Sequence, residues 1–224
     1  MAGGIFFAVH GIKPTTVGRQ FGVERLDGGS ERDVVSMTIP SFEAATKALP
    51  LGRYGCDPSE VEAMFVADPR FANSSTRRQV FDDWLAAKAM IDEISPALVE
   101  CAWVGGSFVT ERLDPDDVDS LFIISKEAFD TLSSNRLRGK LMQFNKKGWL
   151  RQKTGLRAET FVMVRHPHAL PWQGDGVRPE LQSDFALRGA WDDWWLRVRL
   201  GSKEDAPILA EAEPVRGYLE VRWP

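Results

Sequence analysis

The stretch that decides the fold is WVGGSFVTERLDPDDVDSLFII, Trp103 to Ile124. An apolar run ends in the corner Gly105–Ser107, and a polar loop then leads to a second apolar run that opens with Asp117-Val118-Asp119. Side chains alternate across a strand, so Asp117 and Asp119 are expected on one face and Val118 on the other. Two carboxylates on one face repel each other, and a shared Mg²⁺ ion would relieve that repulsion.

The corner supplies the complementary chemistry. Gly105 and Gly106 let backbone N–H groups approach an anion without a Cβ in the way, and Ser107 adds a hydroxyl donor. A helix that starts there would add a favourable potential for phosphate. Taken singly, a Gly-Gly-Ser corner is more often a plain turn, and an Asp-x-Asp pair is more often part of a solvated loop.

The charge distribution changes sharply along the chain, although the formal net charge is only −4. Residues 100–130 hold eight acids and two bases, whereas residues 135–165 hold nine bases and a single acid, Glu159. An acidic cluster followed by a basic run suits a site that holds divalent cations together with polyphosphate. A solvated basic helix is the alternative interpretation of residues 136–165.

The order of the predicted elements indicates an α+β fold. Periodicity predicts a helix over 74–94 with a stop at Pro96, and a helix near 58 capped by Asp57 or Ser59. Strands are expected at 98–104, 118–125, 157–164 and 217–223, and further helices at 126–132, 136–148 and 186–200. Residues 1–48 are predicted to form a small, β-rich N-terminal extension that ends in a helix over 41–49, and residues 49–224 form the main domain.

Composition excludes several classes of protein. No segment approaches the roughly 18 to 20 apolar residues that a membrane span needs, so we expect no membrane partner. Cys56 and Cys101 are too few for a disulfide framework and lack zinc-site spacing. A reducing cytoplasm is therefore the expected compartment.

Taken together, the motifs resemble the signature of the DNA polymerase beta-like nucleotidyltransferase superfamily. The form GGSFVTERLDPDDVD, with Pro115 two residues before Asp117, is similar to a group of small nucleotidyltransferase-like proteins of bacterial and phage genomes. The segments LPLGRYGCDPSEVEAMFV and RGYLEVRW resemble the entry segment and the closing strand of that group. The resemblance covers residues 49–224 and implies a nucleotidyltransferase-like mixed sheet flanked by helices.

The resemblance also implies the site residues. Asp117 and Asp119 would hold Mg²⁺, with Glu159 as the third carboxylate of a two-metal site, although the superfamily carries Asp more often at this third position. The corner Gly105, Gly106 and Ser107 would bind the phosphates of a nucleoside triphosphate such as ATP.

The expected function is Mg²⁺-dependent transfer of a nucleoside monophosphate from NTP to a hydroxyl of RNA, such as tRNA, or of protein. The basic run 136–165 favours an RNA acceptor. The resemblance suggests a role in toxin–antitoxin modules or in phage–host conflict. One alternative is a catalytically inactive protein of the same fold that acts as a binding or regulatory module, and another is an accessory phage protein.

Other polar and aromatic residues carry weaker signals. His166 and His168 are interpreted as loop histidines, because no further ligands stand at zinc spacing. Asp114 and Asp116 are expected to be solvated loop residues rather than ligands. Trp191, Trp194 and Trp195 are predicted to pack in the core rather than to stack on bases, because 191 and 195 are one helical turn apart.

Overall fold

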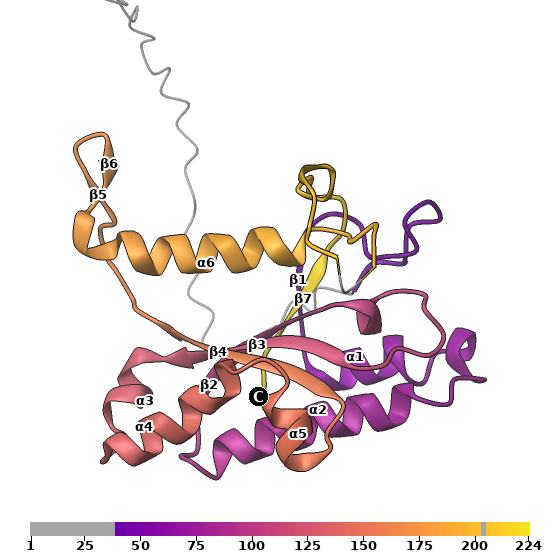
Figure 1. Ribbon diagram of the computed structural model, residues 1–224, viewed down its shortest axis with the longest axis horizontal. Coiled ribbons are helices and arrows are strands. Elements are labelled where there is room, and N and C mark those ends of the chain that lie inside the picture. The colour runs from indigo at the N-terminus through magenta and orange to yellow at the C-terminus, as the bar shows by residue number, and fades with distance from the viewer. Residues whose placement is uncertain (1–38, 203–204) are drawn as a thin grey trace, which may run out of the picture. The chain divides into compact units, whose positions relative to one another are not determined.

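The described part of the chain is an α+β structure built on one five-stranded mixed sheet. The computed structural model describes residues 39–202 and 205–224. The strands are β1 (Arg53–Cys56), β2 (Val99–Gly105), β3 (Val118–Ser125), β4 (Ala158–Arg165) and β7 (Tyr218–Val221), in the order β1-β7-β2-β3-β4. β2 runs antiparallel to β7 and β3, whereas β1 is parallel to β7 and β4 is parallel to β3. The predicted α+β class is confirmed (Figure 1).

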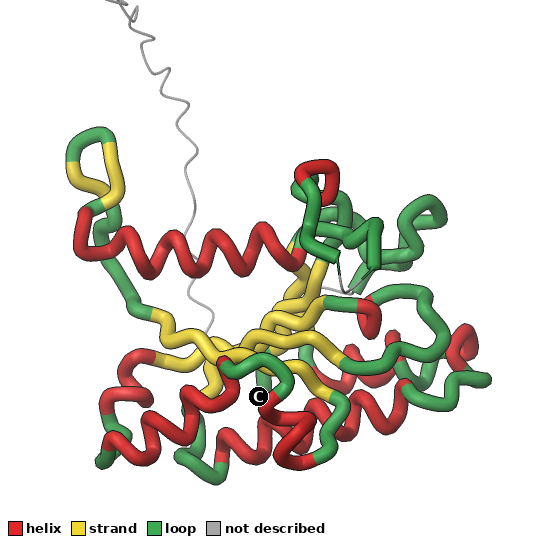
Figure 2. Tube along the Cα trace, viewed as in Figure 1, coloured by secondary structure: helices red, strands yellow, loops and turns green. Residues whose placement is uncertain are grey.

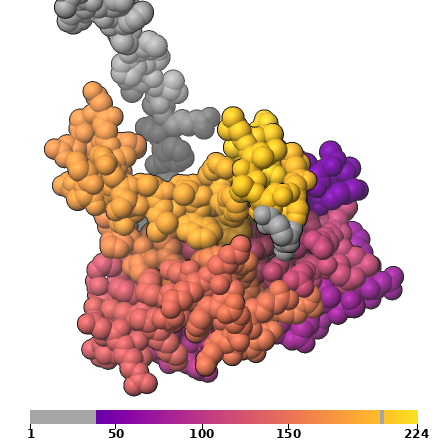
Figure 3. Space-filling view, in the orientation of Figure 1, coloured from indigo at the N-terminus to yellow at the C-terminus, as the bar shows by residue number. Residues whose placement is uncertain are grey.

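Helices cover both faces of this sheet. The helices are α1 (Pro58–Phe65), α2 (Arg77–Asp92), α3 (Lys126–Asp130), α4 (Asn135–Met142), α5 (Trp149–Thr154) and α6 (Gln182–Trp195). α1 to α5 lie on one face and α6 alone crosses the other, preceded by a small hairpin of β5 (Trp172–Gln173) and β6 (Gly176–Val177) (Figures 1 and 2). Backbone N–H groups of Val215 and Arg216 donate to the carbonyl of Leu196, so the segment before β7 lies beside the end of α6 (Figure 3).

Strand β3, which lies between β2 and β4, is buried on both faces, which explains its nearly continuous apolar sequence. Phe122 and Ile124 belong to the core under α2, where the Phe122 ring stacks on Trp84 at 6.5 Å between centroids. Leu121 and Ile123 point the other way, into a smaller core with Trp195 of α6. The two alternating sets of side chains thus join the helices on both faces to one strand.

Two predicted helix ends are confirmed. Asp57 is the N-cap of α1: its carboxylate accepts hydrogen bonds from the backbone N–H of Ser59 at 2.8 Å and of Glu60 at 3.0 Å. The Glu60 carboxylate in turn accepts from the backbone N–H of Asp57. The helix predicted over 74–94 is α2, which ends at Asp92, before Pro96.

Two predicted helices differ in the structure. Residues 41–49 form a turn rather than a helix: Lys47 has a φ of 57°, and Ala48 makes an isolated bridge to Thr110. A segment this short does not sustain a helix by itself, and Phe42 packs here against Phe65 and Phe71. The helix predicted over 136–148 ends early: α4 stops at Met142, a 3₁₀ turn follows over Gln143–Asn145, and α5 begins only after Gly148, which has a φ of 69°.

The predicted extension is only partly within the described residues. Residues 39–48 pack on the main core, where Ile39 is buried and Phe42 lies against its edge. The β-rich part of the predicted extension, before residue 41, lies almost entirely outside the described residues. Within residues 39–202 and 205–224, no helix is long and apolar enough to cross a membrane.

Candidate functional site

The Gly-Gly-Ser corner and the first carboxylates meet where β2 ends beside the start of β3. Gly105 is the register partner of Asp119 across these antiparallel strands. Gly106 has a φ of 71°, and a Cβ at this position would overlap the carboxylate of Asp119. Glycine is therefore required at position 106 both for its backbone conformation and for room. The local sequence thus holds the corner and Asp119 in contact.

The third predicted carboxylate lies on the next strand. Glu159 of β4 is the register partner of Asp119, and adjacent strands are about 4.8 Å apart. Because side chains alternate along a strand, Asp119 lies on the same face of the sheet as Leu121 of β3, and Glu159 on the same face as Met163 of β4. Leu121 and Met163 belong to the core under α6. Asp117 stands one residue before β3 and is only 9% exposed. The two strands thus bring the three predicted acids to one end of the sheet.

Arginines lie beside these acids. A guanidinium nitrogen of Arg151 lies 3.9 Å from the carboxylate of Asp117. Hydrogen bonding to Asp116, together with the charges of Asp116, Asp117 and Glu159, raises the pKa of Arg151. On the other side, burial lowers the pKa of Arg216, and the nearby charge of Asp119 opposes that shift. Positive charge on the protein itself therefore balances the carboxylates.

Arg216 also fastens the site together, a role that sequence reasoning missed. It donates to the carbonyl of Gly106 at 3.1 Å and to the carbonyl of Trp195, in α6, at 3.3 Å. The sequence does contain a signal, because Arg216 opens the RGYLEVRW segment, whose pattern otherwise predicts only a closing strand. For Arg151, the sequence indicates only membership of the basic run.

The parts of the corner differ in access. Gly105 is buried, and a Cβ there would overlap the indole of Trp195. Gly105 therefore makes room for α6, whereas the half-buried Gly106 and Ser107 remain accessible to a phosphate. No α-helix begins at the corner; residues Ser107–Val109 form one 3₁₀ turn. The helix-terminus contribution considered for this corner is thus absent.

The loop acids hold the loop in place instead of being merely solvated. Asp114 accepts from the backbone N–H of Ser75 at 2.7 Å and from the hydroxyl of Ser74 at 3.1 Å, which ties the loop to the start of α2. Asp116 pairs with Arg151 at 2.8 Å and with Arg157 at 3.2 Å. Both pairings fix the approach to Asp117.

These contacts give a pH-dependent prediction. The hydrogen bond and charge of Arg151, aided by Arg157, lower the pKa of Asp116 to about 2. A depressed carboxyl pKa adds stability above the unfolded pKa near 4, and this is lost as pH falls toward 2. Because the Asp116 side chain is 53% exposed, we expect Asp116→Asn to lower the free energy of unfolding by less than about 1 kcal/mol at pH 7.

Urea unfolding of both proteins at pH 7 and at pH 2.5 measures this difference. The difference in free energy of unfolding between the wild type and Asp116→Asn should be smaller at pH 2.5. The control Asp175→Asn, in the exposed hairpin turn, should not change stability at either pH. A difference that is equal at both pH values would contradict the assignment.

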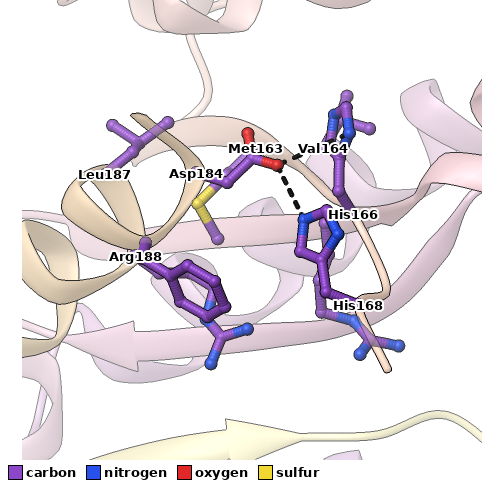
Figure 4. A pocket seen from close by; sticks show the side chains of 9 residues that line it. Met163, Val164, His166, His168, Asp184, Leu187 and Arg188 are labelled. Carbon is purple, nitrogen blue, oxygen red and sulfur yellow. Dashed lines mark hydrogen bonds and ion pairs between the residues drawn. The ribbon is translucent and has the colours of Figure 1, made fainter. Parts of the chain in front are cut away.

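The two histidines meet a carboxylate that the sequence did not pair with them. His166 and His168 lie in the loop after β4, as predicted, and their rings approach one oxygen of Asp184, at 3.5 and 3.2 Å. Figure 4 shows Asp184, from α6, joined by dashed lines to both imidazoles. The contacts tie the end of β4 to the start of α6.

The tryptophans and the basic run divide by exposure. Trp191 and Trp195 stack at 5.7 Å and pack over the sheet, as predicted, whereas Trp194 is 45% exposed. In the basic run, Arg151 and Arg157 pair with Asp116, and Arg165 pairs with Glu100. Five basic side chains of the run are exposed and form no ion pair with a described carboxylate: Arg136, Lys140, Lys146, Lys147 and Lys153.

The described residues contain no group of three or more His, Cys, Asp or Glu side chains that could hold a metal ion as they stand. The three acids are therefore close in the fold without forming a complete ligand cage.

Comparison with known proteins gives one match. The protein family described as "Family of unknown function (DUF6932)" matches residues 40–221. Neither the comparison with curated proteins nor the comparison with solved structures found a match.

Proposed function

The chain belongs to DUF6932, a family of unknown function, and from the residues of its site we propose that it is a Mg²⁺-dependent nucleotidyltransferase. It would move a nucleoside monophosphate from an NTP to a hydroxyl group of RNA or protein. One observation carries the proposal: Gly106 lies against Asp119, which has Glu159 as its register partner on β4. A phosphate-accessible corner and three acids are thus gathered from three strands.

The donor chemistry fits Mg²⁺, which takes oxygen ligands from one or two carboxylates and from substrate phosphates. Asp117 and Asp119 would hold the metal, with Glu159 completing the set. Arg151 and Arg216 already supply positive charge there, so we expect Mg²⁺ to enter together with the triphosphate, whose oxygens complete the ligands. Bound Mg²⁺ would neutralise charge that develops on the phosphoryl group.

The chain's own residues would orient the reaction. Backbone N–H groups of Gly106 and Ser107 would bind the phosphates and place the α-phosphorus. The acceptor hydroxyl oxygen would form a bond to that phosphorus, the bond to the bridging oxygen would break, and pyrophosphate would leave. Glu159 would either complete the metal ligands or accept the proton of the acceptor hydroxyl.

The surface beside the site favours an RNA acceptor. The five exposed Lys and Arg residues of α4, α5 and their connection lie between β3 and β4 in the chain, and α5 also carries Arg151, which lies beside Asp117. Exposed Lys and Arg side chains contact nucleic-acid phosphates without reading sequence, and such binding weakens as salt rises. By resemblance, the setting would be a toxin–antitoxin module or a conflict between phage and host.

A specific observation favours a second candidate, a protein of this fold that binds nucleotide without catalysis. Arg151 and Arg216 lie beside the acids, and the Trp195 indole covers Gly105. Such a site would hold the nucleotide without recruiting Mg²⁺.

Thermal unfolding with each NTP, with and without Mg²⁺, tests the proposal. We expect a rise in melting temperature that requires both nucleotide and metal; a ligand at 100 times its dissociation constant adds about 2.7 kcal/mol of stability. Asp119→Asn should lose the metal-dependent part, and Asp175→Asn should retain it. A shift with NTP alone, unchanged by Mg²⁺, would favour the binding module.

A further inference from the structure

A cavity of about 570 Å³ lies between α6 and the strands β1, β7 and β2. It shares a sheet face with the acids but lies on another part of it. Val104 of β2 pairs with Leu219 of β7, so Tyr218 lies beside Gly105 on the β7 side of β2. Asp119 pairs with Gly105 from the opposite side, on β3. The indole of Trp195 packs on Gly105, between the cavity at Tyr218 and the acid site at Asp119. The cavity is therefore separate from the proposed nucleotidyltransfer site.

The lining is aromatic and apolar at its floor and walls. Trp103 and Tyr218 lie beneath it on the sheet but are only 3% and 0% exposed, so its open walls are the exposed Leu51 and the half-buried Phe185 and Leu196. A volume between about 300 and 1,000 Å³ is typical of sites for small organic molecules, and such sites are mostly apolar with a few polar groups. The half-buried ring of Phe185 is the aromatic surface that a ligand would contact, and it favours a flat ligand.

The charged residues that line this cavity are two arginines and one aspartate, so its net charge is positive. Arg53 and Arg188 line it from β1 and α6. Arg188 forms no ion pair with a carboxylate of the described residues, and its guanidinium lies 5.5 Å from the centre of the Phe185 ring. The one acid in the lining, Asp192, accepts the hydroxyl hydrogen bond of Tyr218. Two guanidinium groups thus face a space whose only carboxylate is already occupied.

Arg53 forms only a long ion pair with Glu220. Its closest approach to Glu220 is 3.5 Å, whereas Arg222 contacts the same carboxylate at 2.6 Å and Trp103 donates to it at 3.2 Å. The Arg53 side chain is 48% exposed, and its guanidinium lies 5.4 Å from the Trp103 ring centre. An anion that entered the cavity would therefore meet an available donor there.

Gly189 gives a second, independent observation. It lies inside α6, lines the cavity, and a Cβ built on it would meet nothing within 4 Å. Glycine within a helix is less stable than alanine by about 1 kcal/mol, so neither the backbone nor the packing of the fold explains its presence. A small residue at this position leaves the cavity open.

We propose that this cavity binds a small ligand with a flat aromatic body and one carboxylate or phosphate group. The aromatic body would lie against the Phe185 ring and the side chain of Leu196. The anionic group would bind between Arg53 and Arg188, since guanidinium groups form paired hydrogen bonds with both kinds of anion.

Calorimetric titration of the full chain tests the proposal with three probes: 2-naphthoate, 2-naphthyl phosphate and the neutral 2-naphthalenemethanol. One of the two anions is expected to bind saturably at one site per chain, at least about tenfold more tightly than the neutral probe. The tighter of the anions identifies the carboxylate or the phosphate as the natural group. No saturable binding, or equal binding of the neutral probe, would overturn the proposal.

Variants locate the binding. Arg188→Gln and Arg53→Gln should each weaken it by about tenfold or more, and the exposed Arg199→Gln should not. Gly189→Leu should fill the cavity and abolish binding, while thermal unfolding shows a fold at least as stable, because leucine is the better helix former. Binding by Gly189→Leu at wild-type affinity would refute the location. Nucleotidyl transfer is not used in these measurements, so the two proposals fail separately.

Discussion

Replacing Arg77 by methionine is expected to lower the free energy of unfolding by about 3 to 5 kcal/mol. Arg77 is 1% exposed, and burial lowers its pKa to about 10, so it is charged at neutral pH. Its guanidinium donates to four backbone carbonyls, those of Phe65, Phe108, Thr110 and Arg112, at 2.5 to 2.9 Å. Methionine would replace the apolar stem and leave these buried acceptors without donors.

The neighbouring residue provides the control. Arg78 is 54% exposed and pairs only with surface acids, Glu62 and Asp82, so Arg78→Met should change stability by less than about 1 kcal/mol. Urea unfolding of the two variants side by side measures the contrast. Losses within 1 kcal/mol of each other would show that the four carbonyl contacts contribute little. Three of those carbonyls follow the Gly-Gly-Ser corner, so Arg77→Met should also weaken nucleotide binding.

Gly106→Ala is expected to lower the free energy of unfolding by about 3 kcal/mol. A left-handed backbone carries a penalty of about 1 to 2 kcal/mol for alanine, and the remainder comes from displacing the Asp119 carboxylate from the new Cβ. The displaced carboxylate would also move away from Arg216, which lies beside it. Chemical unfolding gives the size of the loss.

Gly155 separates the two contributions. Its φ of 80° is also left-handed, but a Cβ there would meet nothing within 4 Å. Gly155→Ala should therefore lose only the backbone part, about 1 to 2 kcal/mol. Equal losses at positions 106 and 155 would mean that the approach of Asp119 to the corner adds no constraint.

The local patterns predicted the parts of this fold that depend on neighbours in sequence. Alternation placed Glu159 in a strand with Phe161 and Met163, and the apolar runs around the corner became β2 and β3. The cap at Asp57 and the end of α2 follow from local hydrogen bonding and from Pro96. These features need no knowledge of the sheet order.

The missed features depend on contacts between distant parts of the chain. β7 enters the sheet between β1 and β2, which brings Arg216 to Asp119, and no local pattern contains that order. The packing of Trp195 of α6 on Gly105 likewise joins residues far apart in the chain, so no local pattern predicts it. The turn at 41–49 replaces a helix because tertiary packing of Phe42 outweighs a weak local preference.

Transfer of label from α-³²P NTPs tests most directly the claim that the corner and the three acids form a nucleotidyltransfer site. The chain would be incubated with each NTP, Mg²⁺ or Mn²⁺, and pooled tRNA or cell lysate. We expect metal-dependent labelling of an RNA or a protein that falls by at least about a thousandfold in Asp117→Ala and Asp119→Ala, and by a smaller factor in Glu159→Gln. Asp175→Asn should label as the wild type does. No labelling with any NTP, together with no metal-dependent thermal shift, would contradict the account.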